Sequence, residues 1–336
     1  MTPDRGPAAA AGVTYGIDIG GTKVLGVALG AGDAMVAEAR VPTPTGTRSI
    51  VGSHVAGAVA LVVAQLDATL GAPAHAVDAP VGVGAPGMVD RRGRLCFAPN
   101  LPQAHGVDWT QLIGDELPGR AIVIENDANL AILAEHRLGS ACGYDHVLLV
   151  TLGTGIGGGI VIDGRVEVGA AGFAGEIGHM VVDPAGPPCP CGRRGCWERY
   201  ASGAGLGVLA REAALAGRLD EVVRRAGGDP ESVRGEDVSA AAAEGDVGAR
   251  AVIEEVGAWI GFGLANLACV LDPECFVLGG GVVEAGSLLI DAARANFAAL
   301  LEGGDRRPRA TIVPATFGER AGAVGAALAA RQGGLW

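Results

Sequence analysis

Two glycine-rich turns of similar design, far apart in the chain, constrain this sequence more than any other feature. The first lies in segment 16–23 (GIDIGGTK) and the second in segment 151–159 (TLGTGIGGG). Each is flanked by apolar, β-branched runs, a pattern that predicts strand, tight turn, strand. Glycine lets backbone N–H groups approach a phosphate closely, and a threonine hydroxyl adds a further donor. The pair therefore predicts a nucleotide site shared by two domains.

Length and composition indicate a globular chain of two domains. The 336 residues are enough to bury a large core, and 49% hydrophobic with 18% charged residues is typical of a folded protein. The formal net charge is −12, so the chain offers no basic field for nucleic acid. Lys23 is the only lysine, which we attribute to a compositional bias towards Ala, Gly and Arg.

We expect neither a signal segment nor a membrane span. No apolar stretch precedes the first predicted strand at Val13. The longest uncharged apolar run, 256–271, is shorter than a bilayer span and carries Asn266, so it predicts a buried helix. The seven cysteines are an odd number and three of them cluster, which indicates a reducing compartment. We therefore expect a cytoplasmic protein without membrane partners.

Strands and helices alternate along the chain in the manner of an α/β fold. In the first half, the pattern predicts strands over 13–19, 24–29, 34–41, 77–83 and 121–124, a turn over 84–87, a hairpin over 88–97, and helices over 49–70 and 127–138. In the second half it predicts strands over 147–152, 156–162, 275–278 and 311–313, and helices over 203–216, 236–244, 246–271, 287–301 and 321–331. These elements predict two α/β lobes with a cleft between them and a boundary near Asn126.

The sequence Glu125-Asn126-Asp127 lies where a buried strand ends and a helix begins. Functional sites of α/β folds lie at the carboxyl ends of strands. Asp127 can be the cap of the following helix, or it can be a general base directed into the cleft. The residues alone leave both interpretations open.

A candidate zinc site follows the second hairpin. His179 lies ten residues before Cys189, and Cys191 and Cys196 complete a set of one imidazole and three thiols. Four such ligands suit tetrahedral Zn²⁺ and leave no open position, so we expect a structural site. The remaining cysteines are expected in apolar surroundings, namely Cys96, Cys142, Cys269 and Cys275.

Three further polar residues and a third glycine-rich strand end are candidates for ligand binding. A metal-held loop would fix Glu198 and Glu176 rigidly, and rigid carboxylates suit sugar hydroxyls; Asn100 is another candidate partner. Gly279, Gly280 and Gly281 follow a strand and either pack against a purine and its ribose or form only a turn.

In this order, the motifs resemble those of the ROK family of bacterial sugar kinases. The resemblance covers about residues 13–330 and includes segments 18–23, 84–87, 125–127, 153–155, 175–179 and 189–196. The cysteine loop with its upstream Glu-x-x-His is the most family-specific part. The resemblance implies the actin-like, hexokinase-type (ribonuclease H-like) ATPase fold. It also implies that the last helix returns to the N-terminal lobe, which gives a small lobe of residues 1–126 plus 321–336 and a large lobe of residues 127–320 with the zinc loop.

The family also implies ATP-dependent phosphorylation of a hexose, most simply glucose at the 6-hydroxyl. Asp127 would accept the hydroxyl proton and Asp18 would hold Mg²⁺. The sugar would be bound by Gly87, Asn100, Asn126, Asp127, Glu176, His179 and Glu198. The phosphates would be bound by Gly20, Gly21, Thr22, Lys23, Gly153, Thr154 and Gly155, and the adenosine by Gly279, Gly280 and Gly281. Zinc would be held by His179, Cys189, Cys191 and Cys196, and the family suggests a homodimer or homotetramer.

Several alternatives stay open at this point. The substrate can be another hexose, such as mannose, fructose or N-acetylglucosamine, and the donor can be polyphosphate or ADP instead of ATP. A sugar-sensing regulator is a further alternative, although the predicted strand at Val13 leaves little room for a DNA-binding module and the chain is acidic. The zinc loop and the sugar-type carboxylates disfavour a chaperone-type ATPase.

Overall fold

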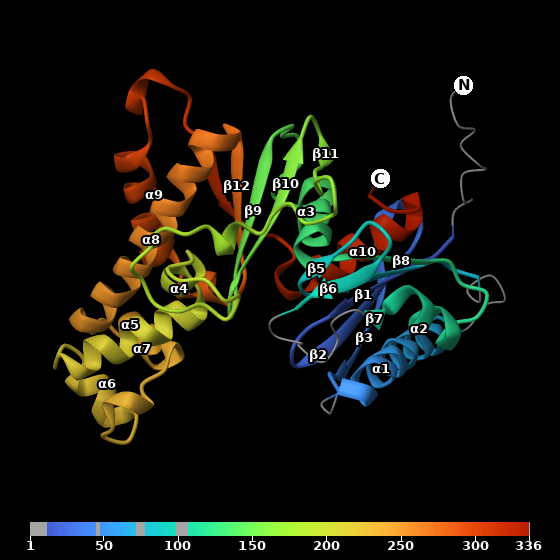
Figure 1. The fold of residues 1–336 in the computed structure, drawn as a ribbon, viewed down its shortest axis with the longest axis horizontal. Coiled ribbons are helices and arrows are strands. Elements are labelled where there is room, and N and C mark those ends of the chain that lie inside the picture. Colours follow the sequence, from blue (N-terminus) through green and yellow to red (C-terminus); the bar gives the residue numbers. More distant parts are fainter. Residues whose placement is uncertain (1–11, 45–47, 72–77, 99–106, 336) are drawn as a thin grey trace. The chain divides into compact units, whose positions relative to one another are not determined.

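The computed structural model describes residues 12–44, 48–71, 78–98 and 107–335, which form two compact units (Figure 1). The first unit comprises Met1–Cys142, Val166–Ala174 and Thr316–Trp336, and the second comprises Gly143–Arg165 and Gly175–Ala315. The helix that begins at Asp127, which we expected to open the second lobe, packs in the first unit. The chain thus passes between the units four times.

A five-stranded mixed sheet forms the centre of the first unit. Its order is β3-β2-β1-β4-β8, from strands β1 (Thr14–Ile19), β2 (Lys23–Leu29), β3 (Met35–Pro42), β4 (Val81–Ala85) and β8 (Ile122–Asn126). Strands β1, β4 and β8 are parallel, whereas β2 and β3 run antiparallel as a meander. A small sheet of β5 (Met88–Val89), β6 (Arg94–Phe97) and β7 (Val107–Asp108) lies beyond β4 in the sequence.

Helices cover both faces of this sheet, because its strands carry apolar residues on both faces. On β2, Val24 and Ala28 join the core formed with α1 (Arg48–Thr69) and α2 (Trp109–Glu116). Leu25, Val27 and Leu29 point the other way and join the core formed with α3 (Asp127–Leu138) and α10 (Ala321–Gln332). The C-terminal helix α10 therefore packs on β1, β4 and α3, as the resemblance implied.

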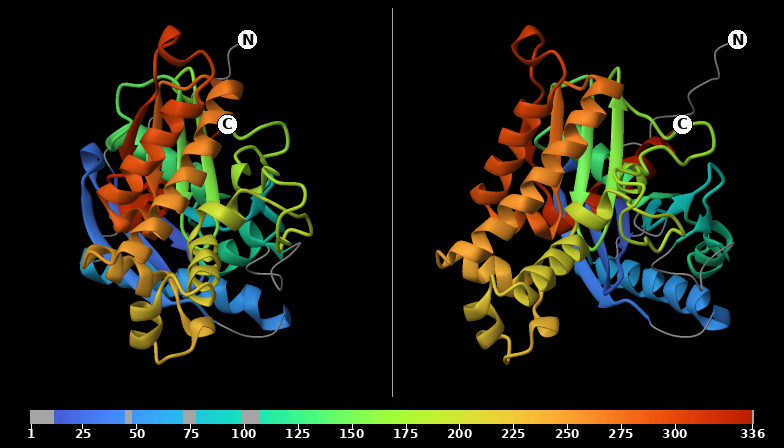
Figure 2. Two further views of the ribbon diagram at one scale, coloured as in Figure 1. Left: turned by 90° about the vertical axis from the view of Figure 1, so that its left-hand side faces the viewer. Right: turned by 60° about the vertical axis from the view of Figure 1, so that its left-hand side comes forward.

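The second unit repeats the design with the sheet β11-β10-β9-β12-β13. Its strands are β9 (Val147–Leu152), β10 (Ile156–Ile162), β11 (Arg165–Val166), β12 (Cys275–Gly279) and β13 (Thr311–Pro314). Its helices are α4 (Glu198–Ala201), α5 (Gly203–Leu215), α6 (Asp220–Arg225), α7 (Gly235–Ala243), α8 (Val247–Leu271) and α9 (Ser287–Leu300). Helices α8 and α9 pack side by side in both views of Figure 2.

Helix α8 is the core helix of the second unit. By length and composition it could cross a membrane, but 61% of its most apolar window is buried inside the structure. Val256, Ile260 and Leu264 are completely buried in the core cluster formed with β9, β12 and α9. The buried helix expected over 256–271 is therefore confirmed within a longer element.

Several sequence-based expectations differ from the structure. The strand expected over 77–83 is β4, which begins at Val81 and continues to Ala85, so part of the expected turn over 84–87 is strand. Helices α2, α4 and α6 were not expected. Cys275 is buried, but Cys96, Cys142 and Cys269 are exposed: Cys96 of β6 and Cys269 of α8 face away from the core, and Cys142 lies in a turn after α3.

Candidate functional site

Asn126, not Asp127, is the cap of helix α3. Its Oδ1 accepts hydrogen bonds from Ala128 N at 2.9 Å and Asn129 N at 3.0 Å, and its Nδ2 donates to Gly87 O at 2.9 Å. The side chain thereby joins the end of β8 to the turn after β4. Asp127 is the first helical residue, where the helix dipole favours a negative charge. Asp127 Oδ1 also accepts from Ala128 N at 2.8 Å, so Asn126 is the cap and Asp127 adds a second contact to the first turn of the helix.

Asp18 lies beside Asp127 at the same edge of the sheet. In the β1–β4–β8 register, Asp18 pairs with Gly84 and Gly84 with Glu125, so the carboxyl ends of three parallel strands meet here. Burial, with the negative charge of Asp127 as a second cause, raises the pKa of Asp18 to about 7, against a smaller opposing effect of Lys23. A buried carboxylate next to a second one is a site that favours a bound cation.

The first turn of α10 closes over Asp18. A Cβ atom at Gly322 would lie 2.8 Å from both Cγ and Oδ1 of Asp18, so only glycine fits beside the carboxylate. Helix α10 has no side-chain cap at its N-terminus. Asp18 is therefore enclosed by residues of β1, β4 and α10, and the contact with α10 joins positions 18 and 322. Sequence analysis missed Gly322, because nothing in the local pattern of a helix marks a contact to a distant strand.

The first glycine-rich turn connects β1 to β2. Gly20 N donates to Lys23 O at 2.9 Å, and Thr43 Oγ1 donates to Gly20 O at 2.6 Å. Gly21 and Thr22 are exposed, and nothing lies within 4 Å of a Cβ built at Gly21. The turn is thus anchored at its base while its tip has open space. Lys23 forms an ion pair with Glu319, a partner that the sequence pattern did not reveal.

Glu125 is a buried acid immediately before the Asn126-Asp127 pair. Its exposed fraction is 2%. Burial raises its pKa to about 8, and the charge of Arg91 opposes this only in part. Glu125 is therefore protonated at neutral pH in the folded unit. Arg91 in turn donates to Gly169 O at 2.9 Å, so the β5–β6 turn holds the segment that follows β11.

The second glycine-rich turn connects β9 to β10 in the second unit. Gly153 N donates to Gly155 O at 3.0 Å, and Gly203 N, at the start of α5, donates to Gly153 O at 2.7 Å. Gly280 has φ +87°, and a Cβ there would lie 2.5 Å from the backbone of Leu152. Gly280 and Gly281, which follow Gly279 at the end of β12, therefore adjoin the turn after β9 at one sheet edge.

The expected zinc ligands come together in the second unit. Ligand atoms of His179, Cys189, Cys191 and Cys196 all lie within 4.8 Å of one another. Cys191 Sγ and Cys196 Sγ are 3.6 Å apart, and Cys189 Sγ lies 3.8 Å from His179 Nδ1. Tetrahedral Zn²⁺ with Zn–S bonds of about 2.3 Å places its ligand atoms about 3.5–4 Å apart. The donor set and its spacing therefore fit one zinc ion.

The two ring nitrogens of His179 face different groups. Nδ1 lies toward the cysteines and is 3.6 Å from Glu198 Oε1, whereas Nε2 is 3.9 Å from Glu176 Oε2. Burial raises the pKa of Glu176, and the nearby Glu198 raises it further, whereas His179 lowers it. Glu198 also lies against the second turn, because a Cβ at Gly155 would be 2.7 Å from its Oε2. The two carboxylates, the imidazole and the glycine turn thus form one cluster.

The expected site residues fall into two groups, one in each unit. The first unit holds Asp18, Gly20, Gly21, Thr22, Lys23, Gly87, Asn126 and Asp127. The second unit holds Gly153, Thr154, Gly155, Glu176, His179, Cys189, Cys191, Cys196, Glu198, Gly279, Gly280 and Gly281. Asn100 lies outside the described residues.

Comparison with known proteins gives a consistent result across the chain. The model of the ROK family matches residues 14–333. A curated glucokinase of Streptomyces coelicolor is 38% identical over 328 residues, which is 96% of this chain and 98% of that protein. The structure of a ROK family glucokinase from Streptomyces griseus in complex with glucose and AMPPNP has a TM-score of 0.82 at 38% identity, over 96% of this chain and 100% of that one. A ROK hexokinase from Thermus thermophilus has a TM-score of 0.76 at 34% identity, covering 94% and 97%.

Proposed function

Since this chain belongs to the ROK family, we propose that it is a sugar kinase that transfers the terminal phosphoryl group of ATP to the 6-hydroxyl of glucose. The observation that carries the proposal is the match at 38% identity, along 96% of the chain, to a glucokinase whose structure contains glucose and AMPPNP. The actin-like, hexokinase-type fold expected from the sequence agrees with these neighbours.

Asp127 is the proposed general base. Its position at the start of α3, directly after β8, is fixed by the Asn126 cap, so the carboxylate is held on a rigid element. Asp127 would accept the proton of the 6-hydroxyl as that oxygen bonds to the γ-phosphorus and the bond to ADP breaks. General-base catalysis of this kind contributes roughly 10²–10⁴-fold.

The phosphate groups are assigned to the backbone of the two glycine turns. Phosphoryl transfer depends on positioning and charge neutralisation, and backbone N–H donors supply both. We assign Asp18 to Mg²⁺, because its buried carboxylate beside Asp127 is stabilised by a cation. When bound, Mg²⁺ supplies positive charge to the phosphate oxygens. We assign Gly279, Gly280 and Gly281 to the adenosine.

The sugar hydroxyls are assigned to Asn126 and Gly87 of the first unit, and to Glu176, His179 and Glu198 of the second. The proposed zinc ion has a structural role, because three cysteines and His179 Nδ1 leave it no open position. Metal bound at Nδ1 fixes the ring and leaves Nε2, which faces Glu176, for a hydroxyl group.

The test of the base is Asp127→Asn, which removes the proton acceptor and keeps the shape. We expect kcat for glucose to fall by at least about 10²-fold, while calorimetry still detects glucose binding. Asp108→Asn is the matched control, since Asp108 caps α2 by accepting from Gln111 N at 3.0 Å and asparagine caps equally well. A near-normal turnover of the Asp127 variant would refute the assignment.

The choice of hexose and donor is tested by a coupled assay. Glucose, mannose, fructose and N-acetylglucosamine are each assayed with ATP, ADP and polyphosphate. We expect the highest kcat/KM for glucose with ATP. A higher value for another hexose or donor would overturn that part of the proposal and leave the kinase assignment in place.

A further inference from the structure

Glu135 is a completely buried carboxylate near the C-terminal end of α3. Its Oε1 accepts hydrogen bonds from Thr316 N at 2.8 Å and Phe317 N at 2.9 Å. Its Oε2 accepts from Ser140 N at 3.0 Å and Ser140 Oγ at 3.1 Å. A carboxylate has about four lone-pair positions, so all of them are used. Three backbone N–H groups and one hydroxyl thus bind Glu135, which distinguishes it from a carboxylate that only interacts with solvent.

The donors lie where the chain passes from one unit to the other. Ser140 precedes by two residues the passage from Cys142 to Gly143, and Thr316 is the first residue after the passage from Ala315. These two segments are far apart in the sequence, yet one side chain binds both. Two of the four passages between the units are thus attached to the same point on α3.

Gly139 shows that the local sequence accommodates this carboxylate. A Cβ at Gly139 would lie 2.2 Å from Oε2 of Glu135 and 2.9 Å from its Cα. The φ of Gly139 is −114°, which other residues adopt readily, so backbone conformation does not require glycine there. The close approach of Glu135, through both its carboxylate and its Cα, does require it.

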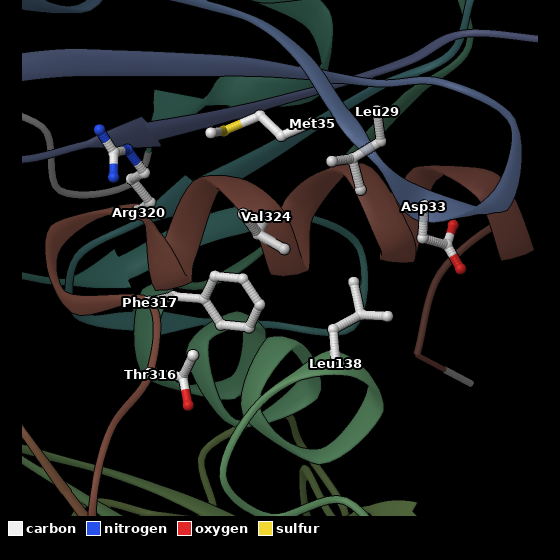
Figure 3. Close-up of a pocket in the computed structure, with 8 residues that line it drawn as sticks. All are labelled: Leu29, Asp33, Met35, Leu138, Thr316, Phe317, Arg320 and Val324. Carbon is white, nitrogen blue, oxygen red and sulfur yellow. The ribbon is translucent and has the colours of Figure 1, made fainter.

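The segment after the second passage is also held by its side chains. Phe317, Val324 and Leu138 line one side of a cavity of about 360 Å³ in the first unit, and Figure 3 shows the Phe317 ring directed toward Val324 of α10 and Leu138 of α3. Phe317 packs against the core cluster that includes α3 and α10. The backbone of Phe317 is therefore fixed by Glu135 while its ring rests on apolar side chains of the same helices.

Helix α3 connects this point to the proposed general base. Asp127 begins the helix and Glu135 lies two turns further on, about 12 Å along the axis at 1.5 Å per residue. A helix of this length transmits a displacement of its end because its hydrogen bonds make it rigid. A shift of either connecting segment would thus move α3 and, with it, Asp127.

We propose that Glu135 is a positioning residue for phosphoryl transfer, which joins two passages of the chain to the helix that carries Asp127. The proposal rests on the proposed kinase function for its effect on turnover. Glu135 does not touch substrate; it acts by fixing the backbone of Ser140, Thr316 and Phe317 to α3. The alternative is that Glu135 only stabilises the C-terminal end of α3.

Glu135→Gln tests the proposal. Glutamine keeps one oxygen acceptor but places an amide nitrogen against donors, so it can serve one segment and not both. We expect kcat, measured with the hexose and donor that the wild type turns over best, to fall roughly 10- to 100-fold, as for a displacement of up to 1 Å at the reacting groups. The KM values for hexose and donor are expected to change by less than about threefold, because Asn126 is the only proposed binding residue apart from Asp127 that is attached to α3.

Hydrogen exchange supplies a readout that does not depend on activity. In the Glu135→Gln variant we expect faster amide exchange at 139–141 and at 315–318 together, since both segments share one anchor. Glu274→Gln is the matched control, because Glu274 Oε2 accepts from Asp145 N at 2.7 Å and His146 N at 3.0 Å, in one passage only. That variant is expected to speed exchange at 145–146 and not at 315–318.

Gly139→Ala provides a second route to the same displacement if the glutamine variant does not fold. This substitution keeps the Glu135 side chain but adds a Cβ where its carboxylate lies, so the carboxylate must move. We expect the same fall in kcat. A folded variant of either kind with normal kcat would overturn the proposal, and so would faster exchange confined to one segment. A wild type that phosphorylated no hexose would instead refute the kinase function, while the exchange data would still decide whether one carboxylate couples the two segments.

Discussion

Replacement of Gly322 by alanine separates the stability of α10 from the position of Asp18. Alanine is favoured over glycine inside a helix by up to about 1 kcal/mol, so helix propensity alone predicts a more stable protein. The added Cβ, however, would lie 2.8 Å from Cγ and Oδ1 of Asp18. In stability, the gain in helix propensity opposes the loss from this close contact. Turnover is affected only by the contact with Asp18.

The displacement of Asp18 follows from the contact distances. Ordinary van der Waals contact begins near 3.4 Å, so a contact at 2.8 Å moves the carboxylate or the helix by about 0.6 Å. Gly84 of β4 also lies close to this carboxylate, since a Cβ built there would be 3.1 Å from the same Oδ1. Since a misplacement of about 1 Å costs roughly 10²-fold in rate, we expect kcat of Gly322→Ala to fall about tenfold. The Mg²⁺ concentration for half-maximal rate should rise, and glucose affinity should be unchanged.

Gly57→Ala is the matched control for this experiment. Gly57 lies inside α1, and nothing is within 4 Å of a Cβ built there. We expect it to gain up to about 1 kcal/mol in urea unfolding, with normal kcat. Both variants are assayed for unfolding and for turnover as a function of Mg²⁺ concentration. A Gly322→Ala enzyme with normal kcat and an unchanged Mg²⁺ requirement would refute the placement of Asp18 at the reacting groups.

Two further outcomes follow from the electrostatics and the zinc cluster. Removal of metal by a chelator should release about one zinc per chain and weaken glucose binding, while nucleotide binding persists. Metal analysis and calorimetry on the same sample would check this. Unchanged glucose affinity after proven zinc loss would count against the role of His179. The pKa of Glu125 is raised to about 8 by burial, so the folded state binds its proton more tightly than the unfolded state and the free energy of unfolding falls as pH rises from about 4.5 to 8. Glu125→Gln lacks this fall and should be more stable than the wild type at pH 9, by on the order of a few kcal/mol at about 1.4 kcal/mol per pKa unit. The two proteins should differ little at pH 4. Parallel curves of unfolding free energy against pH would contradict the raised pKa of Glu125.

Much of the fold could be predicted from the sequence, because its signals are local. Helix α3 was predicted with the bounds it has, since an acidic start and Gly139 mark both ends. Strands β9 and β10 were likewise predicted over 147–152 and 156–162, because a glycine turn separates two apolar runs. Helix α2 was missed, as it is only eight residues long.

The site was predictable only where its residues are close together in the sequence. The zinc cluster is an example, since three cysteines within eight residues constrain each other regardless of the rest of the fold. The contacts of Asp18 with Gly322, and of Glu135 with Thr316, join distant parts of the chain. No periodicity or spacing reports such contacts, because they arise only when α10 packs on β1 and α3.

Asp18 and Glu125, at one edge of the first sheet, explain why the packing of α10 on β1 and α3 matters for the proposed chemistry. Burial raises the pKa of Asp18 to about 7 and that of Glu125 to about 8, and Asp127 contributes to the first of these shifts. Buried carboxyl groups of this kind lower stability as pH rises, and groups with such perturbed pKa values cluster at functional sites. Asp18 differs from Glu125 because two glycines, Gly322 and Gly84, leave space beside its carboxylate for a cation. A side chain at either position would fill that space. A cation bound at Asp18 would offset the free energy lost when this buried carboxyl group ionises. Glu125 avoids the corresponding loss only by remaining protonated. Mg²⁺ should therefore stabilise the wild type against unfolding and should not stabilise Asp18→Asn.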